Sequence, residues 1–236
     1  MRESQFNAFA RTAFAFALLA LAIPLAGCGG GAMSVPITRD AFIPNFASET
    51  DPQTSLPNKL YHWRQFPVRV YISPTNSTPA MLSGVLVGLD WWERATDKVG
   101  SFVQVSDPAS ADIAIAFRDE GANGFSGRTA YSYDSGSALV NARISFNLNY
   151  LGDPSTIGPA AAHEMGHALG IGGHSNDHAD LMSFSPGIFL LTSPSLRDVN
   201  TIKCGYAGLF GRAALAPASS GPIKSATIRC PSSIHP

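Results

Sequence analysis

The chain has 236 residues, a formal net charge of −1, and charged side chains at only 14% of its positions. This near-neutral balance, without a basic patch, argues against nucleic-acid binding and against electrostatic attachment to an anionic membrane surface. Once the two chain ends are set aside, the remaining length suits one folded domain, which we place at residues 59–212. We expect this domain to be monomeric.

The N-terminus has the composition of a secretory segment. An apolar run at residues 13–24 follows a positively charged start and is too short for a permanent membrane span. It ends in Leu25-Ala26-Gly27-Cys28, which resembles the cleavage box of bacterial lipoproteins. The resemblance implies that residues 1–27 are a signal peptide and that Cys28 carries lipid. The mature protein would then lie outside the cytoplasm, anchored to a cell membrane, and to the outer membrane if there is one.

Two regions flanking the domain are expected to lack a core of their own. Residues 28–58 begin with a run of glycines and are rich in Pro, Ser, Thr and Asn, which predicts a flexible tether. If Cys28 carries lipid, Cys204 and Cys230 remain as a pair, and such a pair tends to oxidise outside the cytoplasm. We therefore predict a disulfide that holds the C-terminal tail, residues 213–236, to the last helix.

Apolar alternation and helix signals predict the main elements of the domain. Thr78 as N-cap and Pro79 in the first turn predict a helix that ends near Asp97. Two further helices are expected, from Pro159 to Leu169 and from Pro194 to Cys204. Glycines at residues 118–134 predict a loop. Alternation of apolar side chains predicts four strands, at residues 66–72, 102–105, 112–117 and 138–148.

The most informative segment is residues 163–174, which read His163-Glu164-Met165-Gly166-His167-Ala168-Leu169-Gly170-Ile171-Gly172-Gly173-His174. His163 and His167 lie four apart, so a helix places both on one face, where they can bind one metal ion. Glu164 points to the adjacent side and can reach a water at the metal. Gly170 can leave the helix with a positive φ, and His174 then completes three nitrogen ligands. Three protein ligands leave a fourth zinc position open, as catalytic zinc sites do.

This segment, together with Met182 eight residues further on, resembles the metzincin zinc metalloproteases, and the matrixins most closely among them. The family has two residues between the glycine and the third histidine, whereas this chain has three, residues 171–173. The insertion leaves His178 as a competitor for the third ligand position. We favour His174, because the following Ser175 and the spacing to Met182 match the family.

The resemblance implies an α+β fold, namely a metzincin-type zincin domain. Such a domain has a twisted mixed β-sheet, about three helices, and a zinc cleft between an upper and a lower subdomain. It also implies a zinc-dependent endopeptidase that acts on protein or peptide substrates. His163, His167 and His174 would bind Zn²⁺, Glu164 would be the general base, and Met182 would form an apolar floor beneath the histidines.

Three finer expectations come from the family. Residues 136–148 would form the strand at the cleft edge, where an extended substrate pairs through its main chain. Asp119, Glu120 and Asp134 are candidate oxygen ligands for structural Ca²⁺, although a solvated loop is the favoured interpretation. The apolar run at residues 188–191 fits a specificity pocket and core packing about equally well.

Two other functions remain open. The chain could be a binding lipoprotein that keeps the fold without efficient catalysis, but a decayed site usually loses one of His163, Glu164 and His167. It could instead be an amidase acting on cell-wall peptides, for which a cleft blocked at one end would be expected.

Overall fold

The computed structural model describes residues 45–98, 100–122, 125–151, 154–206 and 221–231. All of them belong to one compact unit, Ser34–Pro236. The predicted signal peptide and Cys28 lie outside the described residues. No helix in the described part of the chain is long and apolar enough to cross a bilayer.

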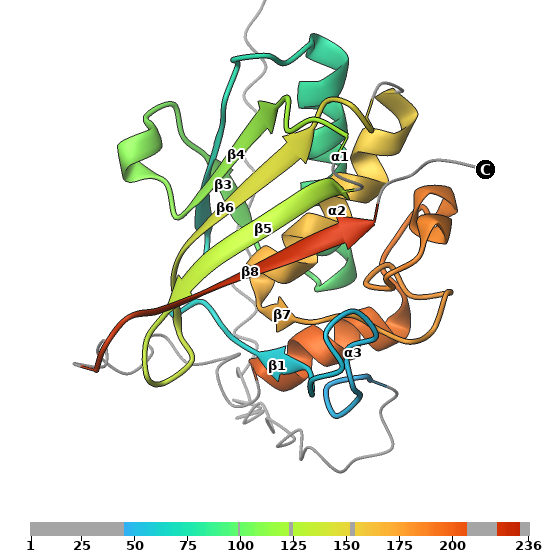
Figure 1. Cartoon of the computed structure of the whole chain (residues 1–236). Helices are drawn as coiled ribbons and strands as arrows, with labels where there is room; N and C mark the ends of the chain where they lie inside the picture. Colours follow the sequence, from blue (N-terminus) through green and yellow to red (C-terminus); the bar gives the residue numbers. More distant parts are fainter. Residues whose placement is uncertain (1–44, 99, 123–124, 152–153, 207–220, 232–236) are drawn as a thin grey trace, which may run out of the picture. The chain divides into compact units, whose positions relative to one another are not determined.

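The architecture is α+β, with a mixed sheet and three α-helices in the described residues (Figure 1). The sheet has six strands in the order β3-β2-β4-β6-β5-β8. A separate two-stranded ladder joins β1 (Lys59–Leu60) to β7 (Ile171–Gly172). The helices are α1 (Pro79–Ala95), α2 (Pro154–Leu169) and α3 (Leu196–Gly205). The sheet strands are β2 (Val68–Ile72), β3 (Phe102–Gln104), β4 (Ile113–Arg118), β5 (Phe125–Tyr133), β6 (Leu139–Asn147) and β8 (Lys224–Pro231).

Strand direction divides the sheet into two parts. β2 runs parallel to β3 and β4, and β4 runs parallel to β6. β5 is antiparallel to both of its neighbours, β6 and β8. Helix α1 supplies the crossover between the parallel strands β2 and β3, a connection that a tight turn could not make. Short 3₁₀ turns at Pro108–Ser110 and Pro186–Leu190 complete the described elements.

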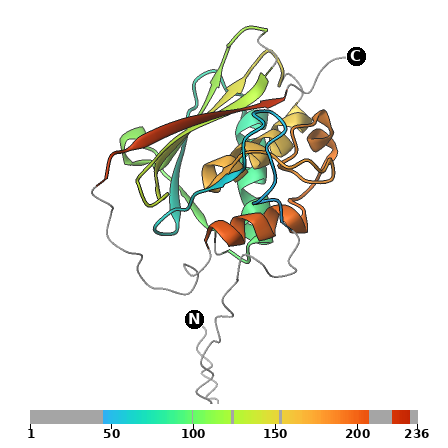
Figure 2. The same cartoon turned by 60° about the horizontal axis from the view of Figure 1, so that its bottom comes forward.

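Helices α1 and α2 lie on the same side of the sheet (Figure 2) and approach each other closely. A Cβ at Gly88 would lie 2.6 Å from the backbone nitrogen of Ala162, so only glycine permits this crossing. The indole nitrogen of Trp92 donates to the carbonyl of Ala162 at 2.6 Å. The buried side chains of β4 and β6 complete this core, including Ile113, Ile115, Phe117, Ala142, Ile144 and Phe146.

The predicted strands and helices are confirmed apart from their ends. Thr78 caps α1, since its hydroxyl accepts from the backbone N–H of Met81. Helix α2 begins five residues before the predicted start and contains Pro159 in its interior. Helix α3 begins two residues after Pro194 and is capped by Ser195.

Two predictions about the sheet were wrong. The predicted loop at residues 118–134 contains the nine-residue strand β5. Its inward positions include Ser126, Gly127 and Thr129, so the apolar alternation that signals a strand is missing. Residues 136–148 do not form the sheet edge either, because β6 pairs with β4 on one side and with β5 on the other. The edge beyond β5 is formed by β8, which lies in the predicted tail.

The boundary of the predicted tether also needs correction. Phe46, Asp51 and Asn58 are buried, so residues 45–58 pack onto the domain rather than linking it. The backbone N–H of Phe46 donates to the hydroxyl of Thr201 on α3 at 3.1 Å. The expected disulfide stays a prediction: Cys204 is buried on α3, whereas the side chain of Cys230 lies outside the described residues.

Candidate metal centre

Three histidines converge at the end of α2. Its helical spacing places His163 and His167 on one face, and the chain turns back at Gly170, whose φ is +126°. After β7 the chain delivers His174 to the same point. One nitrogen from each ring lies within 4.8 Å of the others, and all three side chains are fully buried. The structure therefore brings together the three predicted ligands.

Two of the three residues between Gly170 and His174 form strand β7 of the β1–β7 ladder. Lys59 pairs with Gly172, and at Gly170 a Cβ would come within 2.2 Å of the Tyr61 carbonyl oxygen. Gly173 has a φ of +158°, and a Cβ there would lie 1.9 Å from the side-chain oxygen of Asn58. The competitor His178 is exposed on the following loop and does not belong to the histidine group.

Each imidazole has an acceptor at its Nδ1 atom. The Nδ1 of His163 lies 2.6 Å from the Leu181 carbonyl oxygen, and that of His167 lies 2.7 Å from the Ile171 carbonyl oxygen. The Nδ1 of His174 lies 3.2 Å from a carboxylate oxygen of Asp51. A carbonyl oxygen can only accept, so Nδ1 of His163 and of His167 carries the hydrogen. In the neutral rings, Nε2 is then left with a lone pair.

Burial keeps the His163 and His167 rings neutral. Removal from water, followed by the proximity of the neighbouring imidazoles, lowers the pKa of His163 to about 3 and that of His167 well below its usual value. The Nε2 atoms of His163 and His167 are 3.2 Å apart. Two lone pairs facing each other at that distance repel. A tetrahedral ion bound at about 2.0–2.1 Å from each nitrogen would separate them by roughly 3.3 Å, so the donor set fits a metal ion such as Zn²⁺.

Strand β5 positions Glu164 beside this group. The Thr129 hydroxyl donates to one carboxylate oxygen of Glu164 at 2.5 Å. A Cβ at Gly127 would lie 2.1 Å from the other carboxylate oxygen, so this strand can approach only because residue 127 is glycine. Glu164 is 1% exposed. The strand missing from the sequence prediction is thus the one that fixes the predicted general base.

Met182 packs against Gly166 on the helix that carries His163 and His167. It is fully buried, and a Cβ at Gly166 would come within 2.2 Å of its sulfur. The backbone N–H groups of Leu181 and Met182 donate to the Asp198 carboxylate at 2.8 and 3.1 Å. Burial raises the pKa of Asp198 to about 6, although these hydrogen bonds oppose the shift. Asp198 therefore anchors the turn at Leu181 and Met182, in which the Leu181 carbonyl accepts a hydrogen bond from Nδ1 of His163.

Two residues that support His174 were not predicted from the sequence, Asn58 and Asp51. The side-chain amide of Asn58 donates to the backbone carbonyl of His174 at 3.0 Å, in addition to the contact made by Asp51. Both residues lie in the predicted tether, where their composition gives no periodic signal. Arg197 joins this segment to the loop after His174 through ion pairs with Glu49 at 2.7 Å and with Asp180 at 2.8 Å.

The candidate calcium ligands do not gather. Asp119 and Glu120 precede β5, whereas Asp134 follows it. Glu120 pairs with Arg128 at 2.8 Å, and Asp134 pairs with Arg64. Within the described ranges, the histidines form the one group of three or more candidate ligands.

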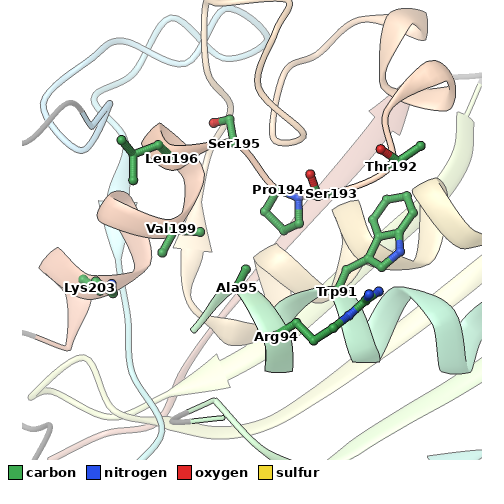
Figure 3. Close-up of a pocket in the computed structure, with 10 residues that line it drawn as sticks. All are labelled: Trp91, Arg94, Ala95, Thr192, Ser193, Pro194, Ser195, Leu196, Val199 and Lys203. Carbon is green, nitrogen blue, oxygen red and sulfur yellow. The ribbon is translucent and has the colours of Figure 1, made fainter. Parts of the chain in front are cut away.

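A surface pocket of about 470 Å³ lies apart from the histidines, between the end of α1 and residues 192–203 (Figure 3). Trp91, Pro194 and Leu196 contribute to its apolar wall. The nearby apolar run at residues 188–191, for which a specificity pocket and core packing are about equally expected, is divided: Ile188 is buried, Phe189 and Leu191 pack on the core, and Leu190 is exposed.

A scan against protein-family models matched no family, and a search of curated proteins found no match. Any function proposed for the chain therefore rests on the structure of the histidine site. The geometry establishes a buried group of three histidines, in an α+β fold, that can hold a metal ion such as Zn²⁺.

Proposed function

We propose that the chain is a metzincin-type, matrixin-like zinc endopeptidase that hydrolyses peptide bonds in protein or peptide substrates. The observation that carries this proposal is the approach of two neutral imidazole nitrogens to 3.2 Å, with Glu164 on the same helix beside them. A divalent cation converts the repulsion of these lone pairs into coordination. Three imidazole ligands suit zinc and leave one coordination position for chemistry.

The residues around the site have separable roles in hydrolysis. Bound Zn²⁺ would supply a Lewis acid that polarises the scissile carbonyl and lowers the pKa of water. Glu164 accepts a proton from the attacking water and delivers it to the departing amine. The Thr129 hydroxyl donates to one carboxylate oxygen and so holds the Glu164 carboxylate in place for proton transfer. Met182 and Asp198 keep the turn that orients His163 in place.

The N-terminal sequence adds a cellular location to this proposal. A lipidated Cys28 would anchor the enzyme to a bacterial membrane outside the cytoplasm, as a monomer with the predicted Cys204–Cys230 bond. Mass spectrometry of the mature N-terminus tests the anchor: a diacylglycerol on Cys28 is expected. An unmodified chain cleaved elsewhere would contradict it.

Metal content and hydrolysis should be measured together on matched variants. The purified chain is expected to hold one zinc ion and to cut a mixed peptide library internally. Glu164→Gln should keep the zinc and lose activity by about 10²–10⁴-fold, the usual contribution of a general base. His174→Ala should lose the zinc, whereas His178→Ala, four residues further along, should keep both zinc and activity.

The alternative outcomes distinguish the competing functions. Zinc binding without hydrolysis of any peptide would favour the binding lipoprotein. Cleavage confined to cell-wall peptides would favour the amidase. Zinc retention by His174→Ala combined with zinc loss in His178→Ala would reassign the third ligand.

A further inference from the structure

The metal centre is closed in this structure. His163, His167 and His174 are fully buried, and Glu164 is 1% exposed. A polypeptide substrate must bring a carbonyl carbon to this point, so something that now covers the site has to move. The strand adjoining Glu164 is β5, through Gly127 and Thr129.

The outer edge of β5 is already occupied. Strand β8 runs antiparallel along it, with Ile228 opposite Thr129 and Ala226 opposite Tyr131 (Figure 1). The same register places residue 230 opposite Gly127. An extended peptide that adds to a sheet edge makes this same main-chain ladder. The C-terminal strand thus lies where a peptide would have to pair in order to lie beside Glu164.

The side chains of β8 alternate in the same way. Ile228 is buried and Ala226 is partly buried, whereas Thr227 and Arg229 are exposed. Cross-strand partners in an antiparallel pair share a face of the sheet. Ile228 therefore lies on the face from which Thr129 reaches Glu164. The strand thus places an aliphatic side chain on the face of the sheet that holds Glu164, where a paired peptide would place one.

Among the described residues, β8 is also paired along one side only. β8 is the last strand of the sheet and pairs with β5 alone, and its large buried apolar side chain in the described positions is Ile228. Edge elements with few buried contacts open more readily than the core to which they are attached. Release of β8 would leave β2, β4 and β6 with all of their partners.

We propose that β8 is an intramolecular occupant of the peptide-binding edge of β5, and that the enzyme becomes accessible to polypeptides only when this strand leaves. This inference rests on the proposed peptidase function, because β8 would regulate access to the site of that peptidase. It also describes the favoured substrate: an extended segment with a β-branched aliphatic residue opposite Thr129 and a small residue opposite Tyr131.

Substitutions on the two faces of β8 test this proposal in the full chain. Ile228→Asp places a charge at the buried anchor and should free the strand, whereas Thr227→Asp places the same charge on the exposed face as a matched control. Ile228→Ala removes the apolar contact without adding a charge and covers the case in which Ile228→Asp does not fold. All measurements are made in reducing buffer, so that no bond to Cys204 holds the strand.

Three measurements are needed. Hydrogen exchange at residues 125–133 reports release of the strand. Binding of a fluorescein-labelled peptide with the sequence of residues 224–231, carrying Cys230→Ser, reports whether the edge of β5 accepts a strand from solution. Hydrolysis of quenched fluorescent peptides reports access to the site. Ile228→Asp should show about tenfold or greater increases in exchange rate, peptide affinity and kcat/KM, because a larger fraction of molecules is open. Ile228→Ala should show smaller increases, and Thr227→Asp should behave as the wild type.

The readouts separate this inference from the proposed function. Tighter peptide binding by the Ile228 variants without hydrolysis in any variant would support the occupied edge and refute the peptidase. Unchanged exchange in both Ile228 variants would overturn the inference, because Ile228 would not hold the strand. Faster exchange with unchanged peptide affinity and unchanged kcat/KM would also overturn it, since β8 would then be a permanent strand that blocks nothing.

Discussion

Asp51 is expected to set the strength of metal binding, although it lies more than 100 residues before the histidines. One carboxylate oxygen is 3.2 Å from Nδ1 of His174, and the carboxylate also accepts from Gln53 and Thr54. Burial raises the pKa of Asp51, but the bonds from His174, Gln53 and Thr54 outweigh it, and the net shift is downward. The group is therefore an anion at neutral pH and fixes the ring with its hydrogen on Nδ1, which leaves Nε2 for the metal.

The size of the effect follows from this contact. Loss of such an outer partner typically weakens metal binding by about 10–100-fold, which corresponds to about 1.4–2.8 kcal/mol. Asp51→Ala removes both charge and acceptor, so we expect a change near the upper end of this range. Asp51→Asn keeps one acceptor oxygen and should fall near the lower end. Competition with a chromogenic zinc chelator measures the affinity, with exposed Asp177→Ala as the control.

Asp51 also organises its own loop, because its backbone carbonyl accepts from the N–H of Ser55. Thermal unfolding of the metal-free variants separates the two roles. If Asp51→Ala binds zinc within threefold of the wild type, the reasoning about ring orientation is refuted. If instead the metal-free Asp51→Asn variant loses as much stability as it loses in binding, the residue acts through folding of residues 51–57.

Three further predictions follow from the site. Gly127→Ala should push the Glu164 carboxylate aside and reduce hydrolysis about 100-fold or more with zinc retained; Gly158→Ala, whose Cβ would meet ordinary contacts at 3.6 Å, is the control, and equal activity in both would contradict the prediction. Because the folded-state pKa of Asp198 is raised to about 6, its stabilisation is present below about pH 4 and is lost as the pH rises through 6. The difference in unfolding free energy between wild type and Asp198→Asn should change by about 3 kcal/mol across this window, and a constant difference in urea melts would refute it. Acidification below about pH 6.5 should release zinc and destabilise the protein, since the depressed pKa of His163 means that unfolded imidazoles take up protons first; equal metal content at about pH 7.5 and 4.5 by equilibrium dialysis would argue against imidazole ligands.

Local patterns in the sequence were sufficient to predict a structural feature wherever that feature lies within one helix or strand. The four-residue spacing of His163 and His167 needs only a helix to place both on one face, and α2 provides it. Thr78 and Pro79 mark the start of α1 by chemistry confined to one turn. Ile113, Ile115 and Phe117 alternate because β4 has one face on the core. In each case the pattern and the structure that satisfies it lie within about ten residues.

Long-range pairing was not predictable in the same way. Asp51 contacts His174 only because residues 45–58 fold back onto the domain. That segment has no apolar periodicity from which the contact could be predicted. β8 has one buried aliphatic residue, Ile228, so its strand signal is weak until β5 is present to pair with it. The predicted tail and the predicted tether therefore both contain segments that pack on the domain: β8 at the sheet edge and residues 45–58 beside His174.

The small and polar residues that kept β5 from being predicted as a strand are also the residues that let it approach Glu164. Where β5 approaches Glu164 of α2 this closely there is no room for large apolar side chains, so Gly127 and Thr129 replace the alternation expected of a buried strand. Gly166 above Met182 and Gly173 beside Asn58 allow the same close approach elsewhere around the histidines. The resulting site buries three imidazoles whose lone pairs converge, an arrangement that is unfavourable until a cation joins them. Metal binding and folding should consequently be coupled, because the ion removes a repulsion that the surrounding packing enforces.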